Sequence, residues 1–124
     1  MIDVVALGEL LIDFTCTGTG DDGYPHMAAH PGGAPANFLA ALAKFGCETA
    51  LIGKVGQDAF GSLLVSTLRD AGIETRGIVR DDTVFTTLAF VTLDETGDRE
   101  FSFARKHGAD KMLTTEDIPC DMLK

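Results

Sequence analysis

The chain has 124 residues, of which 45% are hydrophobic and 23% charged, and this is the composition of one globular domain. Its net charge of −9, from 19 acidic and 10 basic side chains, argues against a nucleic-acid surface, and no apolar run reaches the ~18 residues that cross a membrane. Cys16, Cys47 and Cys120 fit neither a disulfide framework nor a zinc motif, and no basic secretory region opens the sequence, so we expect a cytoplasmic protein without a metal site.

A buried strand is the first element that the sequence predicts. Residues 1–7 are an apolar run with valines that Gly8 ends. The apolar pattern resumes at residues 10–12 and Asp13 follows, so we expect Asp13 at or just past the end of a strand. Ligands bind at that edge of open α/β sheets, and a solvated turn aspartate is an equally good interpretation of this segment alone.

Residues 15–30 are polar and rich in glycine, and we predict that they form a loop. They include the G-x-G-x-x-G pattern of dinucleotide-binding proteins, at residues 18–23. Two aspartates inside the pattern would repel a pyrophosphate, and Tyr24 and Pro25 follow where a helix is required. We therefore reject a dinucleotide site and rank a Rossmann dehydrogenase last among the candidate functions.

Glycines are frequent in the next stretch of the chain, which also carries two apolar runs. Gly32 and Gly33 predict a loop, because consecutive glycines allow tight turns and close approaches of the backbone. Pro35 suits the first turn of a helix over residues 36–45, and Gly46 suits its end. Free backbone N–H groups at the start of such a helix favour oxygen-rich ligands.

A second buried strand is predicted at residues 49–55, and the succession of strand, helix and strand implies a parallel βαβ unit. Residues 58–71 predict a helix that packs on the core, with an aspartate as its cap and Gly72 at its end. We assign this helix no chemistry. A short strand is expected within residues 73–82.

The last third of the sequence predicts antiparallel structure. Residues 83–93 and 99–104 read as a β-hairpin with one solvent-facing side, and residues 106–111 read as a polar loop. Residues 114–117 resemble a capping arrangement that opens a new helix. Because the sequence stops at Lys124 in the middle of this unit, we expect the chain to be the N-terminal part of a longer protein.

Polar groups from three predicted elements suit a sugar. Asp13 supplies a carboxylate, Gly32 and Gly33 supply backbone donors, Asn37 supplies an amide and Arg105 supplies a cation. Each sugar hydroxyl both donates and accepts hydrogen bonds, so this set fits a polyol. The three histidines lie in predicted loops and form no triad, and no nucleophile and base are paired.

One family combines these features. Residues 32–37 read GGAPAN, and Gly46 and Gly56 follow at matching intervals, which resembles the first signature of the ribokinase-type (PfkB) family of carbohydrate kinases. Further segments are similar to fructokinases within that family, namely residues 8–14, 51–61 and 108–110. The resemblance covers nearly the whole chain. It departs from the signature at Leu39, where Ala, Ser or Thr is preferred, so helix packing beneath the sugar loop is expected to differ.

The resemblance implies a three-layer α/β domain with parallel βαβ units over residues 1–124, here only the N-terminal part of a ribokinase-like fold. It also implies a small β-sheet lid that closes over the sugar, with strands within about residues 15–30 and 83–104. Such enzymes phosphorylate a sugar hydroxyl with ATP and Mg²⁺. Lids of this family commonly form a homodimer, which would suit Phe85, Phe90 and Phe101, but a plain core role is the favoured interpretation of each phenylalanine.

The resemblance also implies roles for individual residues. Asp13 matches the family's acceptor for a sugar hydroxyl, the glycines of the GGAPAN segment match its hinge and sugar-contacting loop, and Asn37 matches its sugar-binding amide. Arg105 matches an arginine on the lid side in fructokinase-like and ketodeoxygluconate-kinase-like members, and Phe103 stands near it as an apolar wall.

A second family signature, Asp-Thr-x-Gly-Ala-Gly-Asp, is absent from the sequence. It supplies the catalytic base and the anion hole, so the resemblance implies no catalytic residue in this chain, no ATP or Mg²⁺ bound by this fragment alone, and no activity of the fragment. The alternative is a non-catalytic sugar-binding or dimerising module. Fructose ranks first through family likeness, and ribose and 2-keto-3-deoxygluconate stay open.

Overall fold

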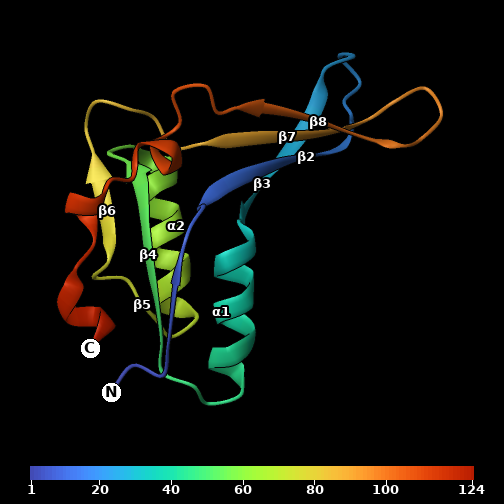
Figure 1. Cartoon of the computed structure of the whole chain (residues 1–124). Coiled ribbons are helices and arrows are strands. Elements are labelled where there is room, and N and C mark those ends of the chain that lie inside the picture. Colours follow the sequence, from blue (N-terminus) through green and yellow to red (C-terminus); the bar gives the residue numbers. More distant parts are fainter.

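The computed structural model describes all of residues 1–124, and it contains two four-stranded sheets. The first sheet and two helices form the body of the molecule, and the second sheet extends from one end of that body (Figure 1). The strands of the first sheet are β1 (Val4–Leu7), β4 (Thr49–Gly56), β5 (Ile73–Glu74) and β6 (Ile78–Asp81). Those of the second sheet are β2 (Leu11–Thr19), β3 (Pro25–Gly32), β7 (Leu88–Leu93) and β8 (Arg99–Ala104).

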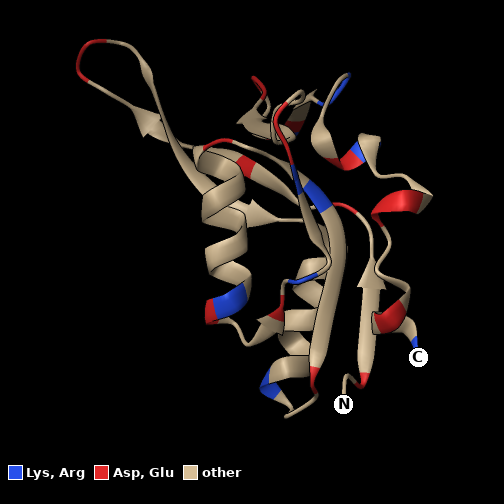
Figure 2. Ribbon diagram, turned by 90° about the vertical axis from the view of Figure 1, so that its left-hand side faces the viewer, with Lys and Arg blue, Asp and Glu red and all other residues tan.

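The first sheet is parallel and is organised around β4. This strand is buried along its whole length and pairs in parallel with β1, β5 and β6. The helices α1 (Ala34–Lys44) and α2 (Ala59–Asp70) lie on the same side of this sheet (Figure 2). Ten buried side chains form the core between these layers, namely Leu10, Ile12, Ala36, Leu39, Leu51, Val55, Leu64, Val65, Leu68 and Ile73. The predicted α/β class with parallel pairing is confirmed.

Both helices begin and end where the sequence predicts. Pro35 lies in the first turn of α1, and the chain leaves that helix through Gly46, whose φ of 89° is open to glycine. Asp58 caps α2 by accepting the N–H of Gly61 at 2.8 Å, and Gly72, with φ of 77°, follows the end of that helix. Neither helix has the length and hydrophobicity that a bilayer crossing requires.

The second sheet corrects the prediction of a loop at residues 15–30. Its strand order is β3-β2-β7-β8, with β2 parallel to β7 and the other two pairs antiparallel. The glycines of this segment indicated a loop, but they belong to the hairpin of β2 and β3. Gly18 lies at a bulge after Cys16, and Gly23 lies in the turn between the two strands. The rejected dinucleotide pattern covers the tip of this hairpin, and no helix follows it.

Two expectations for the later hairpin also change. β7 begins at Leu88 rather than at residue 83, because residues 82–87 cross from the first sheet to the second. The prediction of one solvent-facing side is wrong for β8, because all six of its residues are exposed.

The segment after the hairpin turns more tightly than predicted. Residues 106–111 are not wholly a loop, since the 3₁₀ turn η1 (Ala109–Met112) begins there and buries Ala109. Thr114 and Asp117 form the predicted capping box, yet only the 3₁₀ turn η2 (Thr115–Asp117) follows. Pro119 disfavours a helical conformation at the residue before it, so the turn stops. The 3₁₀ turn η3 (Cys120–Leu123) comes last.

Candidate functional site

Four short connections join the second sheet to the body of the molecule. They are residues 8–10, Gly33, residues 82–87 and residues 105–108. The residues that the sequence singled out lie within or close to these connections. The junction between the two sheets is therefore the candidate site.

Asp13 is the third residue of β2, so the expectation of a strand end is wrong. It lies opposite Ala89 of β7, and Ala89 lies opposite Phe103 of β8. Directly paired residues share a face of a sheet, so Asp13 and Phe103 lie on the same face. Burial raises the pKa of the half-buried Asp13 carboxyl, and the nearby charge of Glu9 raises it further, against a smaller lowering by His30.

The two consecutive glycines bring the backbone against Asp13 and Glu9. Gly32 ends β3, and a Cβ at this residue would collide with the carboxylate of Asp13. Gly33 has φ of 118°, and a Cβ there would lie 2.6 Å from the carbonyl oxygen of Glu9. The next N–H, that of Ala34, donates to Glu9 Oε1 at 3.5 Å. The predicted loop is thus a single residue, Gly33, between a strand and a helix.

Asn37 lies in the first turns of α1, where its N–H donates to the carbonyl of Gly33 at 3.1 Å. Its side chain is exposed and lines a small cavity of about 90 Å³ between α1 and α2, together with Leu10 and Gly32. Asn37 therefore lies near Gly32, on the side of β3 that faces the helices.

Arg105 is held by two carboxylates. Its Nη2 lies 2.6 Å from Glu9 Oε2 and 2.6 Å from Asp110 Oδ2, and its Nε donates to Asp110 at 3.1 Å. These hydrogen bonds, with that of Asp110 the strongest, raise the pKa of Arg105. The Asp110 side chain is 1% exposed and also accepts the hydroxyl of Thr87. The charge of Arg105 is thus compensated within the chain.

Glu9 and Asp110 belong to the candidate site, and the sequence analysis assigned neither of them a role. Glu9 stands between two apolar runs, and an acidic residue in such a place needs a partner when it is partly buried. That signal was available, but the partner lies 96 residues away along the chain. No local pattern identifies such a pair.

Two aromatic side chains extend the face that carries Asp13. Phe101 and Phe103 are 53% and 56% exposed, and their rings stack with centroids 6.4 Å apart. Phe103 also lines a shallow hollow with Phe85 and Arg105 at the base of β8. A carboxylate beside exposed aromatic rings suits a ligand with both hydroxyls and apolar C–H faces.

The residues at the junction do not fit a nucleotide triphosphate. Asp13 and Glu9 would repel its phosphates, the N–H of Ala34 already donates to a carboxylate, and Arg105 is committed to two others. No cluster of three or more His, Cys, Asp or Glu is placed to hold a metal ion. The arrangement can instead accept and donate hydrogen bonds to uncharged hydroxyl groups.

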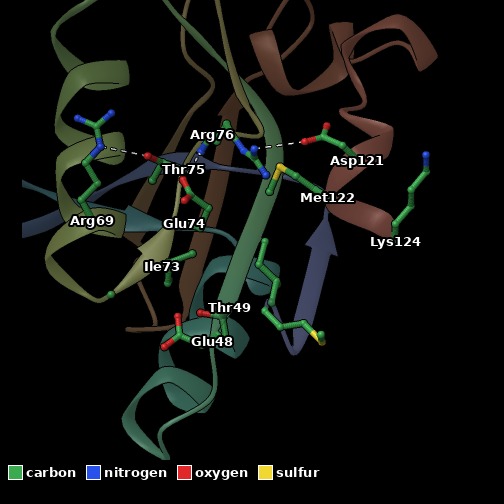
Figure 3. A pocket seen from close by; sticks show the side chains of 13 residues that line it. Glu48, Thr49, Arg69, Ile73, Glu74, Thr75, Arg76, Asp121, Met122 and Lys124 are labelled. Atoms are coloured by element: carbon green, nitrogen blue, oxygen red, sulfur yellow. Dashed lines mark hydrogen bonds and ion pairs between the residues drawn. The ribbon is translucent and has the colours of Figure 1, made fainter.

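A hollow larger than the two at the junction lies elsewhere. It measures about 870 Å³ and is shown from close by in Figure 3. It lies near both chain termini, at the end of the body opposite the second sheet (Figure 1). Arg69, Glu74 and Arg76 line it, and Arg76 pairs with Asp121 at 3.2 Å. Its charges are mixed and largely exposed, and it contains no residue that the sequence singled out.

A family model and known relatives both match this chain. The model of the "pfkB family carbohydrate kinase" matches residues 1–124. Fructokinase-1 of Zea mays is 43% identical over 123 residues, which cover 98% of this chain and 38% of the relative. The chain thus spans well under half the length of such relatives.

Solved structures of two similar proteins share the fold of this chain. The crystal structure of fructokinase from Xylella fastidiosa has a TM-score of 0.91 and 38% identity, covering 96% of this chain and 37% of that chain. A putative ribokinase II from E. coli, in complex with ATP and Mg²⁺, has a TM-score of 0.88 and 30% identity, covering 99% and 40%. The ribokinase-like fold class predicted from the sequence is confirmed.

Proposed function

Because this chain belongs to the pfkB family of carbohydrate kinases, we propose that it is the sugar-binding N-terminal part of an ATP-dependent, fructokinase-like enzyme. In the complete protein, the γ-phosphate of ATP passes to a hydroxyl of the sugar. The observation that carries this proposal is the contact of the Asp13 carboxylate with the backbone of Gly32, on the sheet face that also presents Phe103.

Each residue of the candidate site has a proposed role in holding the sugar. Asp13 accepts a hydrogen bond from a sugar hydroxyl, and Phe103 covers an apolar face of the ring. Gly32 and Gly33 let the backbone approach the sugar, and Asn37 offers an amide that both donates and accepts. This set binds and orients a hydroxyl, which is a large part of what a phosphoryl transfer requires of its acceptor.

Arg105 has a more restricted role than the sequence implied. Its Nε and Nη2 groups donate to Asp110 and Glu9, which leaves the two N–H groups of Nη1 for a ligand. Because both carboxylates fix the guanidinium, we propose that it presents these donors in one orientation. Its charge is compensated, so it acts as a hydrogen-bond donor.

ATP and Mg²⁺ are the proposed cofactors of the complete protein, and ATP supplies the phosphoryl group when bound. Support comes from the putative ribokinase II in complex with ATP and Mg²⁺. Since the junction residues do not fit a triphosphate, we place the catalytic base and the anion hole outside residues 1–124. The fragment alone is therefore expected to be inactive.

The second sheet is the proposed lid. Its strands β7 and β8 lie within residues 83–104, and β2 and β3 extend beyond residues 15–30 at the ends nearer the body. Closure of this sheet over the sugar would exclude water, which otherwise competes for the phosphoryl group. The sheet also exposes Tyr24, Leu93, Phe101 and Phe103, and we propose that part of this surface forms a homodimer. Sedimentation of the complete protein tests that step. The cytoplasmic location stays a prediction.

A non-catalytic sugar-binding or dimerising module is the second candidate. The acidic junction favours it, because the residues there offer sugar hydroxyls a partner and offer a triphosphate none.

Phosphorylation assays on the complete protein distinguish the two candidates. With ATP and Mg²⁺, the kinase proposal expects ADP formation that depends on added sugar, with fructose as the best acceptor against ribose and 2-keto-3-deoxygluconate. Calorimetry with the same sugars runs in parallel. Sugar binding without phosphoryl transfer supports the module, and the absence of both sugar binding and transfer overturns both candidates.

A further inference from the structure

A second group of residues in the chain has no part in the proposed sugar site. Gly56, Asp58 and Gly61 form the spacing G-x-D-x-x-G at the end of β4 and the start of α2. None of them contacts Asp13 or the two consecutive glycines of the site. Their contacts are instead with Thr86, in the connection that enters β7.

Two hydrogen bonds join Asp58 to Thr86, and a third joins Thr86 to Gly56. Asp58 Oδ2 accepts the N–H of Thr86 at 2.9 Å, and Asp58 Oδ1 accepts its hydroxyl at 2.8 Å. The Thr86 hydroxyl oxygen accepts the N–H of Gly56 at 3.0 Å. Thr86 is 1% exposed, so water cannot replace these bonds without local opening. One carboxylate thus caps α2 and holds the connection to the second sheet.

The two glycines of the spacing make room for this pair. A Cβ at Gly56 would collide with the Asp58 carboxylate and lie 2.7 Å from the Thr86 nitrogen. A Cβ at Gly61 would collide with the carbonyl of Gly56 and lie 3.2 Å from the Thr86 hydroxyl oxygen. Larger residues at either position would push Thr86 away from Asp58.

Thr87, the residue after Thr86, is hydrogen-bonded to residues in and next to the candidate site. The carbonyl of Thr87 accepts the N–H of Ile12, next to Asp13, at 3.1 Å. The hydroxyl of Thr87 donates to Asp110, which holds Arg105. The position of Thr86 therefore sets both the strand that carries Asp13 and the carboxylate that carries Arg105.

We propose that Asp58 and Thr86 are positioning residues, which fix the second sheet on the body so that Asp13 meets the sugar in a productive orientation. They touch no substrate. Removing the pair would let β2 and β7 shift together while the first sheet and its core stay folded. Only the kinetic consequence of this proposal rests on the proposed sugar kinase function.

Thr86→Val tests the proposal, because it removes the hydroxyl and keeps the shape and the backbone N–H. In the complete protein we expect the KM for the sugar to rise about tenfold while the KM for ATP is unchanged. Thr86→Ser, which keeps the hydroxyl, should restore the sugar KM. Asp58→Asn should resemble Thr86→Val, and the double variant should be no worse than the poorer single variant.

Thr83→Val is the matched control. Thr83 lies in the same connection and also donates its N–H and its hydroxyl to an aspartate, Asp81 at the end of β6, but Thr83 is exposed and is hydrogen-bonded to no residue of the site. This variant should leave both KM values unchanged. A sugar KM that changes equally in Thr83→Val and Thr86→Val would overturn the positioning role.

Hydrogen exchange gives a readout that does not depend on kinase activity. The amide of Ile12 should exchange faster in Thr86→Val than in the unchanged protein, and the amides of residues 49–55 in β4 should exchange at the same rate. The amide of Gly56 loses its acceptor, the Thr86 hydroxyl, and should also exchange faster. Unchanged exchange at Ile12 contradicts the proposal even if the protein is a kinase. Faster exchange at Ile12 supports it even if no sugar is phosphorylated, in which case the proposed function fails alone.

Discussion

At the scale of single residues, the surroundings of Asp13 disfavour its ionised form, although the proposed sugar contact uses that form. Burial and the charge of Glu9 raise its pKa above the ordinary value of 3.8, so the folded protein disfavours the carboxylate that the proposed sugar contact uses. The stabilising contribution of a raised carboxyl pKa is complete below the unfolded-state pKa. It is lost as the pH rises through the folded-state pKa. At neutral pH, the ionised Asp13 therefore destabilises the fold.

Asp13→Asn should accordingly raise the midpoint of thermal unfolding at about pH 7, because the amide carries no charge to desolvate. The difference between the variant and the unchanged protein should shrink as the pH is lowered from about 7 to the ordinary carboxyl pKa of 3.8, because the raised pKa of Asp13 makes it take up a proton over this range. Thermal melts followed by circular dichroism at both pH values measure this. Asp21→Asn, at the exposed hairpin tip, is the control and should change neither midpoint. A lower midpoint for Asp13→Asn than for the unchanged protein at neutral pH would contradict the conclusion that ionised Asp13 destabilises the fold.

Residue types were predictable from the sequence, and their partners were not. The resemblance selected Asp13, Gly32 and Arg105, and the structure brings the first two into contact. Arg105 was expected to supply a cation to the sugar site. It is compensated instead by Glu9 and Asp110, and the ion pair with Glu9 spans 96 residues of sequence. Such a pairing depends on the way two sheets meet, which local patterns do not encode.

At the scale of elements, the junction between β3 and α1 depends on Gly33. Its φ of 118° is strained for any other residue, and a Cβ there would lie 2.6 Å from the carbonyl oxygen of Glu9. Gly46, after α1, also has a positive φ, of 89°, but a Cβ there would meet nothing within 4 Å. Comparing alanine substitutions at Gly33 and Gly46 therefore separates the energetic cost of backbone strain from that of a close contact.

Gly46→Ala should reduce the free energy of unfolding by about 1 kcal/mol, through backbone strain alone. Gly33→Ala should reduce it by about 3 kcal/mol or more, because the collision with the Glu9 carbonyl adds to the strain. Urea unfolding of the complete protein measures both changes. Equal losses for the two variants would show that close approach to Glu9 has no energetic role.

The elements themselves were predicted unevenly, and the reason is physical. Helices α1 and α2 follow apolar periodicity and capping residues that act within one segment, so both were found. The hairpin of β2 and β3 was read as a loop, because its glycines lie at a bulge and a turn that only the pairing of strands defines. The resemblance placed lid strands there when the local pattern did not.

At the scale of the whole molecule, the chain divides into a body and a projecting sheet that meet at one junction. The body has a parallel sheet, two helices and the apolar core. The projecting sheet carries Asp13 and the exposed aromatic rings. Two hydrogen-bonded networks join them, one centred on Asp58 and one on Arg105. The proposed sugar site depends on both parts, and the proposed nucleotide site lies outside the chain.

Sugar and nucleotide binding by Asp13→Asn in the complete protein is the most direct test of this account. The account predicts that calorimetry finds affinity for the preferred sugar weakened about tenfold or more, since a hydrogen bond to a charged acceptor is lost, while ATP affinity is unchanged. Asp21→Asn should match the unchanged protein for both ligands. Unaltered sugar affinity in Asp13→Asn, or an equal loss of ATP affinity, would contradict the account.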